Sequence, residues 1–258
     1  MKGIIRMVEH DFRNFFRYKW WLVGLISMNL ADLFVSALVY NTIMKSQVSS
    51  SIGGSYFNFF APGLAVTGLF ASAFMIGREI NMERRREVHH YMLSLPMTRF
   101  ELAMGRVLSG GLRGMMYMSP LLLTCFIFVG FPTIWQLLLI LAVLFLLAVG
   151  ISGLSISIAV STSSLEKFIT ARGAVYYVLF FCSTVFYPLQ VIQNAGAELA
   201  ALAEINPLSG ASDMIRSILL PSAPAFSFSY LSIFYVAAFS AIFTFTAVFA
   251  YMKILERR

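Results

Sequence analysis

The residues that could carry chemistry are few in this chain of 258 residues, and none stands in a catalytic or metal-binding pattern. Cys125 and Cys182 lie within apolar runs and lack a CxxC partner, so they indicate neither a metal site nor a disulfide framework. His89-His90 has no cysteine or carboxylate at ligand spacing on the same helical face, and the serines between 152 and 164 have no paired base. The sequence therefore predicts no catalytic residue, no metal site and no enzyme activity.

Two charged residues stand inside long apolar runs. Asp32 is the only carboxylate deep within such a run, where a charge is costly and marks a functional candidate. We expect it to line a substrate path or to pair with a polar group of another helix; solvation near the outer end of its run is the alternative. Arg113 lies about two turns inside another run, and snorkelling to the nearer head groups is expected.

The composition indicates a membrane protein. Apolar residues make up 59% of the chain, charged residues only 12%, and the mean hydropathy is +0.79. A soluble domain is about a quarter charged. The net charge of +7 also suits a nucleic-acid-binding protein, but the placement of the charges indicates membrane topology instead. The expected surroundings are therefore a lipid bilayer, with no nucleic acid partner.

Six apolar runs have the length of membrane-spanning helices, which need about 20 mostly apolar residues. Lipid leaves backbone groups no external partner, and the runs lack the alternation of barrel strands, so all six are expected as helices. The fold class is therefore an all-α membrane protein with six transmembrane helices. The runs are Trp20–Met44, Tyr56–Gly77, Leu108–Gly130, Ile134–Val160, Phe168–Ile192 and Tyr230–Met252.

Basic residues fix the expected orientation of these spans. Of the 19 lysines and arginines, all except Lys45 and Arg216 fall on one side of the predicted membrane. Because cytoplasmic loops carry the excess of positive charge, both termini are expected in the cytoplasm. An even number of spans agrees with this. We expect a multi-pass protein of the cell (plasma or inner) membrane.

Two segments outside the spans have their own apolar pattern. Residues 1–19 place Ile4, Val8 and Phe12 at helical spacing between arginines, which favours an amphipathic helix in the cytoplasmic interface over a frayed tail. Residues 193–229, expected on the outer face, carry two short apolar groups separated by Asn206-Pro207. Proline suits a first helical turn, so two short interfacial or re-entrant helices are predicted there.

The longest expected cytoplasmic connection, 78–107, contains a proline break followed by a helix start, LSLPMTRFELAMGR. Pro96 disfavours helical geometry at Leu95. Thr98 and Glu101 then match the capping box, in which a threonine side chain and an acid three residues later satisfy exposed helix amides. By pattern alone, this stretch fits a plain connector and a rigid docking surface equally well. Near the same connection, Gly110 and Gly114 favour close packing of helices within the chain over a dimer seam.

This stretch resembles the signature of type-2 ABC transporter permeases: leucines, a proline, a small hydroxyl residue, an arginine and an acid, then glycine with a basic residue. The acid Glu87 stands near the place where that family usually has glycine and threonine. Two further matches follow, Tyr187-Pro188-Leu189 and Asn206-Pro207-Leu208-Ser209 with Asp213 and Arg216. With six spans, inside termini and an amphipathic first helix, the resemblance covers nearly the whole of one permease domain, 1–258.

The resemblance implies the membrane subunit of an ATP-driven exporter, which works as a dimer with a second copy or a related permease. Two separate ATPase subunits would dock on the cytoplasmic connections and hold the ATP and magnesium, since this chain has no phosphate-loop motif. The substrate class would be amphipathic: a drug, a lipid or a glycolipid. The implied ATPase-docking residues are Glu87, Leu93, Leu95, Pro96, Thr98, Arg99, Phe100 and Glu101.

Two other classes of function remain as alternatives. A six-span transporter or channel driven by ion gradients would favour broken spans, several buried charges and an inverted repeat, whereas this chain shows one deep acid and no visible repeat. An intramembrane enzyme would need paired catalytic groups at bilayer depth. All three histidines, at 10, 89 and 90, are instead expected in the cytoplasm.

Overall fold

The computed structural model of the protein describes residues 2–17, 56–86, 97–221 and 230–256, with scattered positions between 20 and 39. All of its regular secondary structure in these residues is helical. No strand occurs in these ranges. The helices are α1 Lys2–Arg17, α4 Tyr56–Ala73, α5 Met75–Arg85, α7 Arg99–Val129, α8 Ile134–Ser161, α9 Leu165–Phe181, α10 Leu189–Ala195, α11 Ala197–Ile205, α12 Pro207–Leu219 and α13 Tyr230–Glu256.

Four long segments of the described chain are apolar and long enough to cross a membrane: Tyr56–Arg85 (α4 with α5), Arg99–Val129 (α7), Ile134–Ser161 (α8) and Tyr230–Leu255 in α13. They correspond to the second, third, fourth and sixth predicted spans. The prediction of an all-α membrane protein is thus confirmed for these helices. More than half of the first predicted span lies outside the described residues, and Asp32 is among the residues that are not described. The total of six spans and the orientation of the termini therefore stay predictions.

The fifth predicted span, 168–192, is wrong as one continuous helix. Helix α9 ends at Phe181 after 17 residues, and α10 begins at Leu189. The carboxamide nitrogen of Asn206 donates to the carbonyls of Leu179 and Cys182, both at 2.7 Å. Because the last carbonyls of a helix need partners from elsewhere, this side chain satisfies the end of α9 and lets the backbone leave the helix.

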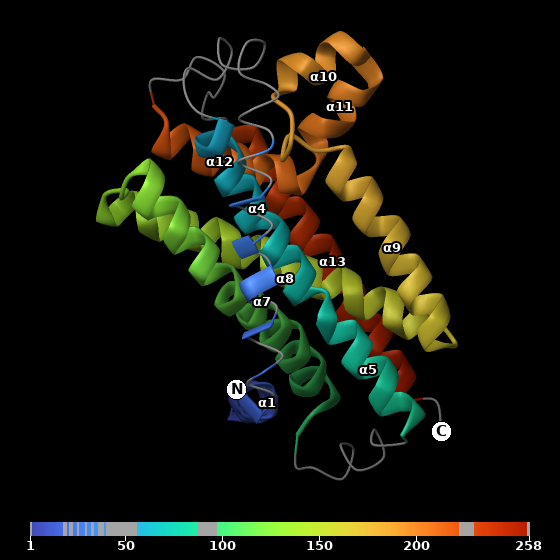
Figure 1. Cartoon of the computed structure of the whole chain (residues 1–258). Helices are drawn as coiled ribbons and strands as arrows, with labels where there is room; N and C mark the ends of the chain where they lie inside the picture. The colour runs from blue at the N-terminus through green and yellow to red at the C-terminus, as the bar shows by residue number, and fades with distance from the viewer. Residues whose placement is uncertain are drawn as a thin grey trace.

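The long helices form one bundle with a continuous apolar core (Figure 1). Helix α13 packs along α8, α4 packs along α7, and α7 joins the two pairs through α8. The short helices α10, α11 and α12 lie at one end of the bundle, while α1 lies at the other (Figure 1). The start of α1, the end of α5, the first turns of α7 and the end of α13 lie toward that second end (Figure 1).

Small residues set the separation of the central helices. A Cβ on Gly153 of α8 would lie 2.5 Å from the carbonyl oxygen of Phe243 in α13, so only glycine allows this approach. Gly110 and Gly114 of α7 face Ile76 and Ala73 on the second span. These two glycines therefore pack within the chain, as the sequence favoured.

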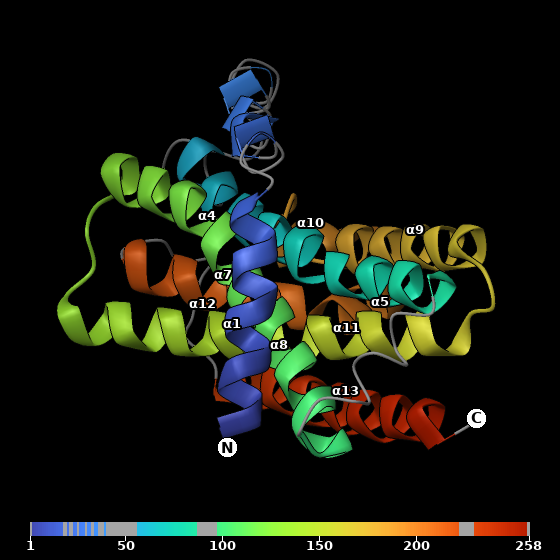
Figure 2. The same cartoon turned by 90° about the horizontal axis from the view of Figure 1, so that it is seen from below.

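Helix α1 crosses beneath α7 and α8 at one end of the bundle (Figure 2). The predicted helix is confirmed, but the face buried against α7 is Gly3, Met7 and Asp11 rather than the predicted apolar stripe. That stripe, Ile4, Val8 and Phe12, lies next to the buried face and is half-buried. The location of α1 in the cytoplasmic interface stays a prediction.

The two short helices predicted around Asn206-Pro207 are present as α11 and α12, and α10 adds a third. Pro207 occupies the first turn of α12, and the Asn206 side chain accepts from the Leu208 amide at 3.0 Å. Proline has no amide hydrogen to lose at this position, so the pair starts a helix cleanly. Whether these helices lie at the outer membrane face stays a prediction.

Candidate functional site

The start of α7 is held by the predicted capping box. Thr98 is extended, and its Oγ1 accepts from the Glu101 amide at 3.1 Å. Glu101 Oε2 in turn accepts from the Thr98 amide and from its hydroxyl, both at 3.3 Å. Such a cap stabilises a helix start by about 1 kcal/mol. It fixes a short turn in which Arg99 and Phe100 are exposed, with Phe100 at 52%.

The same turn is in contact with α1. A Cβ on Gly3 would lie 2.7 Å from Glu101 Oε2, and one on Gly105 would lie 2.8 Å from the Cβ of Met7. Two glycines, one on each helix, therefore allow the backbones of α1 and α7 to cross closely. Glu101 is thus engaged inside the chain, both as the cap of α7 and as a neighbour of α1.

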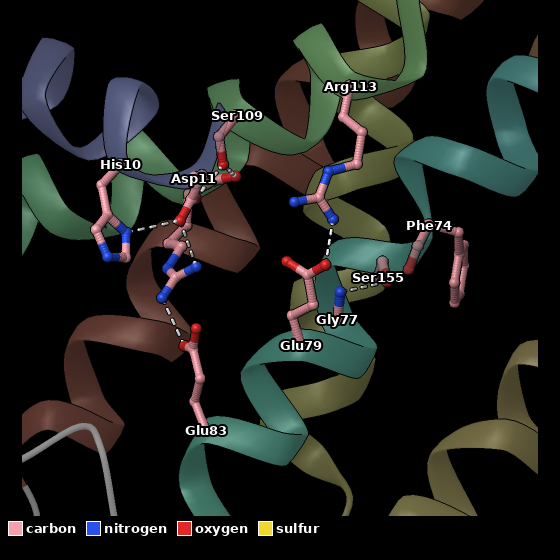
Figure 3. A network of polar contacts seen from close by, with 10 residues as sticks. His10, Asp11, Phe74, Gly77, Glu79, Glu83, Ser109, Arg113 and Ser155 are labelled. Atoms are coloured by element: carbon pink, nitrogen blue, oxygen red, sulfur yellow. Dashed lines mark hydrogen bonds and ion pairs between the residues drawn. The ribbon is translucent and has the colours of Figure 1, made fainter. Parts of the chain in front are cut away.

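One turn further along, a buried guanidinium joins three helices. Arg106 of α7 pairs with Asp11 of α1 at 2.9 Å and with Glu83 of α5 at 2.5 Å. Ser109 donates to the other oxygen of Asp11 at 2.6 Å, and His10 Nδ1 lies 3.4 Å from Asp11 Oδ1 (Figure 3). We call Asp11, Glu83 and Arg106 the charge triad.

The surroundings of Asp11 favour its ionised form. Burial by itself raises the pKa of Asp11, but the Arg106 charge and the hydrogen bonds from His10 and Ser109 outweigh it, so the pKa lies below its ordinary value. The hydrogen bond to Asp11 raises the pKa of His10 above its ordinary value. Tyr251 of α13 is an electrostatic neighbour of all three members. Four helices therefore meet around one buried positive charge.

A second ion pair continues this line toward the centre of the bundle. Arg113 of α7 pairs with Glu79 of α5 (Figure 3). The expectation that Arg113 snorkels to head groups is therefore wrong: the residue is buried, because α5 continues the second span and places a carboxylate opposite it. Helices α5 and α7 are joined by charge at two successive levels.

Beside this pair, the second span is broken at Phe74, between α4 and α5. The hydroxyl of Ser155 in α8 donates to the carbonyl of Phe74 and accepts from the amide of Gly77 at 3.2 Å (Figure 3). These are groups that a broken helix leaves without an internal partner. Ser155 of α8 therefore hydrogen-bonds to a neighbouring span. A side chain of α8 therefore stabilises the junction between α4 and α5.

Sequence reasoning named only part of this arrangement. Thr98, Arg99, Phe100 and Glu101 share the first turn of α7, whereas Glu87, Leu93, Leu95 and Pro96 lie outside the described residues. It missed Asp11 and Glu83. The sequence did contain a signal for Asp11. Gly3, Met7 and Asp11 are spaced by four, so they lie on one face of a helix.

The opposite end of the bundle holds a further buried arginine. Arg216 of α12 donates to the carbonyls of Phe59 and Val185 at 2.9 Å and of Thr184 at 2.7 Å. Its guanidinium lies 3.8 Å from the centre of the Phe59 ring and pairs with Asp213 at 2.7 Å. This arginine therefore ties α12 to the start of α4 and to the chain that follows α9.

These features define a multi-pass helical membrane protein with a charge-linked group of helices at one end. A family model described as ABC-2 type transporter matches residues 4–220. That range includes both arginine sites and most of the bundle, and the chain belongs to the ABC-2 type transporter family. Members are membrane subunits for transport and are not catalytic themselves. A search of curated proteins returned no match to this sequence.

Proposed function

We propose that this chain is the permease subunit of an ATP-binding cassette exporter in the cell membrane, powered by separate ATPase subunits. The observation that carries the proposal is the first turn of α7. Its cap fixes Thr98 and Glu101 while Arg99 and Phe100 stand exposed beside them. An exposed aromatic ring with a basic neighbour is a typical anchor for a protein partner.

A movement of the first turn of α7 would be transmitted to neighbouring helices. The charge triad lies within two turns of the cap and joins α7 to α1 and α5. The pair of Arg113 with Glu79 adds a second link between α5 and α7. Buried charges resist separation, because a lone buried charge costs several kcal/mol. Motion imposed by an ATPase would therefore move α1, α5 and α7 together.

Family membership and the apolar character of the bundle support the remaining parts of the proposal, which are the dimer, the ATPase subunits, the substrate class and the direction of transport. The chain would work as a dimer, with a second copy or a related permease, and each permease would receive one ATPase that holds ATP and magnesium. An amphipathic substrate, such as a drug, a lipid or a glycolipid, suits a path between apolar helices. Export is the direction that we propose.

The test is co-purification of the chain with a candidate ATPase subunit, together with its ATP turnover in proteoliposomes. The variant Arg99→Glu with Phe100→Ala removes the exposed anchor without touching the cap. A matched control is Phe131→Ala, which removes an exposed ring beyond the far end of α7, at 71% exposure against 52% for Phe100. We expect loss of ATPase binding for the double variant alone, with unchanged thermal stability.

Two outcomes would contradict the proposal. If the double variant binds and couples as the wild type does, the turn is a connector and the docking residues lie elsewhere. If no ATPase binds the wild type, a transporter driven by an ion gradient becomes the better explanation.

A further inference from the structure

The second span changes its main neighbour where it is broken at Phe74. Helix α4 packs chiefly along α7, whereas α5 packs chiefly along α8. The ladder of α4 ends with the Phe74 amide, which donates to the Phe70 carbonyl at 3.0 Å. In a continuous helix the Gly77 amide would donate to the carbonyl of Ala73, four residues back. It donates instead to the Ser155 hydroxyl of α8 at 3.2 Å, so the junction is held from outside its own helix (Figure 3).

The hydrogen bonds at this junction can be exchanged. The Ser155 hydroxyl makes two of them, as a donor to the Phe74 carbonyl and as an acceptor from the Gly77 amide. Closure of the helix would give the Gly77 amide a backbone partner and release the hydroxyl. Because one set of hydrogen bonds would replace another, the bent and the closed form differ little in hydrogen-bonding energy. Two arrangements of similar free energy are the requirement for a two-state hinge.

A second hydroxyl lies one turn away on α8. Ser152 is fully buried, and among the described residues no group hydrogen-bonds to its Oγ. A Cβ on Gly110 of α7 would lie against this oxygen and 3.0 Å from Ile76 of α5, so Ser152 lies where α5, α7 and α8 meet. An unpaired buried hydroxyl is costly, so an arrangement that gives it a partner is favoured. Ser155 therefore stabilises the observed bend, whereas Ser152 favours a departure from it.

Helix α7 has small residues at the same level. Gly110 faces Ser152 and Ile76, and a Cβ on Gly111 would lie 2.9 Å from Val149 of α8. These two glycines directly follow Ser109. Runs of glycine and serine are among the few places at which long helices bend. The break in the second span therefore coincides with a point at which its neighbour α7 can bend.

On either side of this level, arginines tie the helices together. Toward α1, Arg106 joins α1, α5 and α7 through the charge triad, and Arg84 of α5 donates to three carbonyls at the end of α8, each at 3.3 Å. Toward the other end, Arg216 joins α12 to α4. We call the first group the α1 block (α1, α5, the first turns of α7 and the end of α8) and the second the α12 block (α4 and α12).

We propose that the junction Phe74–Gly77 is a hinge about which the α1 block moves relative to the α12 block. The Ser155 hydroxyl holds the bent form, and the Ser152 hydroxyl gains a hydrogen bond in the other form. The hinge is a property of the chain itself and needs no ATPase, nucleotide or substrate. A failure of ATPase docking would therefore leave this inference standing, and a rigid junction would leave the docking proposal standing.

The test measures distances between spin labels by double electron–electron resonance, on the full chain in detergent. Labels are attached to cysteines introduced after Cys125 and Cys182 are replaced by alanine, and labelled protein is diluted with unlabelled protein so that distances within one copy are read. One label pair spans the two blocks, at Arg85 of α5 and Leu202 of α11, which packs on α12. The control pair lies within the α1 block, at Arg85 and Arg13. All three positions are exposed.

The two serines should shift the hinge in opposite directions. The pair between blocks should give two distances, one of them that of the bent form, and the pair within the α1 block should give one. Ser155→Ala should lower the ratio of bent to other form about tenfold, and Ser152→Ala should raise it about tenfold, as expected for one hydrogen bond. Ser161→Ala is the matched control, because its hydroxyl donates to the Ser157 carbonyl of the same helix.

Ser152→Ala carries the test alone if Ser155→Ala folds poorly, since it removes no hydrogen bond made in the described structure. A single distance between the blocks in wild type and in both serine variants would show that the junction is rigid. A shift of both variants in the same direction would mean that the serines act through packing, and an unchanged ratio in Ser152→Ala would remove its part in the hinge. Two distances within the α1 block would show that this group of helices does not move as a unit.

Discussion

Arg106 of α7 and Asp11 of α1 form a buried ion pair at 2.9 Å, although 95 residues separate them in the chain. Their side chains are only 1% and 3% exposed, so salt and water screen the pair poorly. Glu83 adds a second carboxylate on the other terminal nitrogen of the guanidinium. The first helix is therefore locked by charge to the helix that begins at the candidate docking turn.

Asp11→Asn should destabilise the protein by about 1–3 kcal/mol, because a charge-assisted buried hydrogen bond is lost while Arg106 keeps Glu83. Thermal unfolding in detergent measures this loss. Glu9→Gln is the matched control: its exposed pair with Arg13 on the same helix should contribute less than about 0.5 kcal/mol. Equal effects of the two substitutions would mean that the charge triad does not anchor α1.

Gly105→Val should separate α1 from α7. The new Cβ would lie 2.8 Å from the Cβ of Met7, and overpacking of this kind costs about 1–3 kcal/mol. Limited proteolysis should then cut α1 faster than in the wild type. Gly173→Val in α9 is the control, because nothing lies within 4 Å of a Cβ there. If both valine variants resist protease as the wild type does, the crossing is looser than the structure shows.

The stability contributed by His10 should depend on pH. Its hydrogen bond to Asp11, helped by the Asp11 and Glu83 charges and opposed by burial and by Arg106, raises its pKa above the ordinary 6.5. A histidine with a raised pKa in the folded state stabilises the fold fully below its unfolded value, and that contribution is lost as pH rises through the folded value.

Comparing the melting temperatures of wild type and His10→Gln across pH 5 to 9 tests this dependence. The wild type should melt higher below about pH 6.5, and the difference should shrink as pH rises above that value. A difference that is constant across this range would show that His10 acts by packing and not by charge.

Ser155→Ala should weaken the junction between α4 and α5, since it removes a donor to Phe74 and an acceptor for Gly77. Leaving buried backbone groups unpaired costs about 1–3 kcal/mol, which thermal unfolding can measure. The control is Ser161→Ala, because within the described part of the chain that exposed hydroxyl bonds only to the carbonyl of Ser157 in its own helix. Equal unfolding temperatures for the two alanine variants would contradict this prediction. They would mean that the backbone between α4 and α5 does not need the Ser155 hydroxyl.

The sequence by itself determined the features whose signals are local. The capping box at Thr98 and Glu101 lies within one helical turn, so four residues were enough to predict it. Asn206-Pro207 likewise predicted the start of α12. The long apolar runs predicted four helices that match in type and place, because membrane spans are read from length and hydropathy alone.

Only the tertiary structure decided which distant groups meet. The end of α9 depends on the Asn206 side chain, 27 residues beyond Leu179, so hydropathy extended that helix too far. Arg113 is buried because Glu79 lies opposite it, and the triad exists because α1 crosses α7 at two glycines. Such pairings follow from how the helices pack, and a buried charge in one helix carries no local mark of the helix that neutralises it.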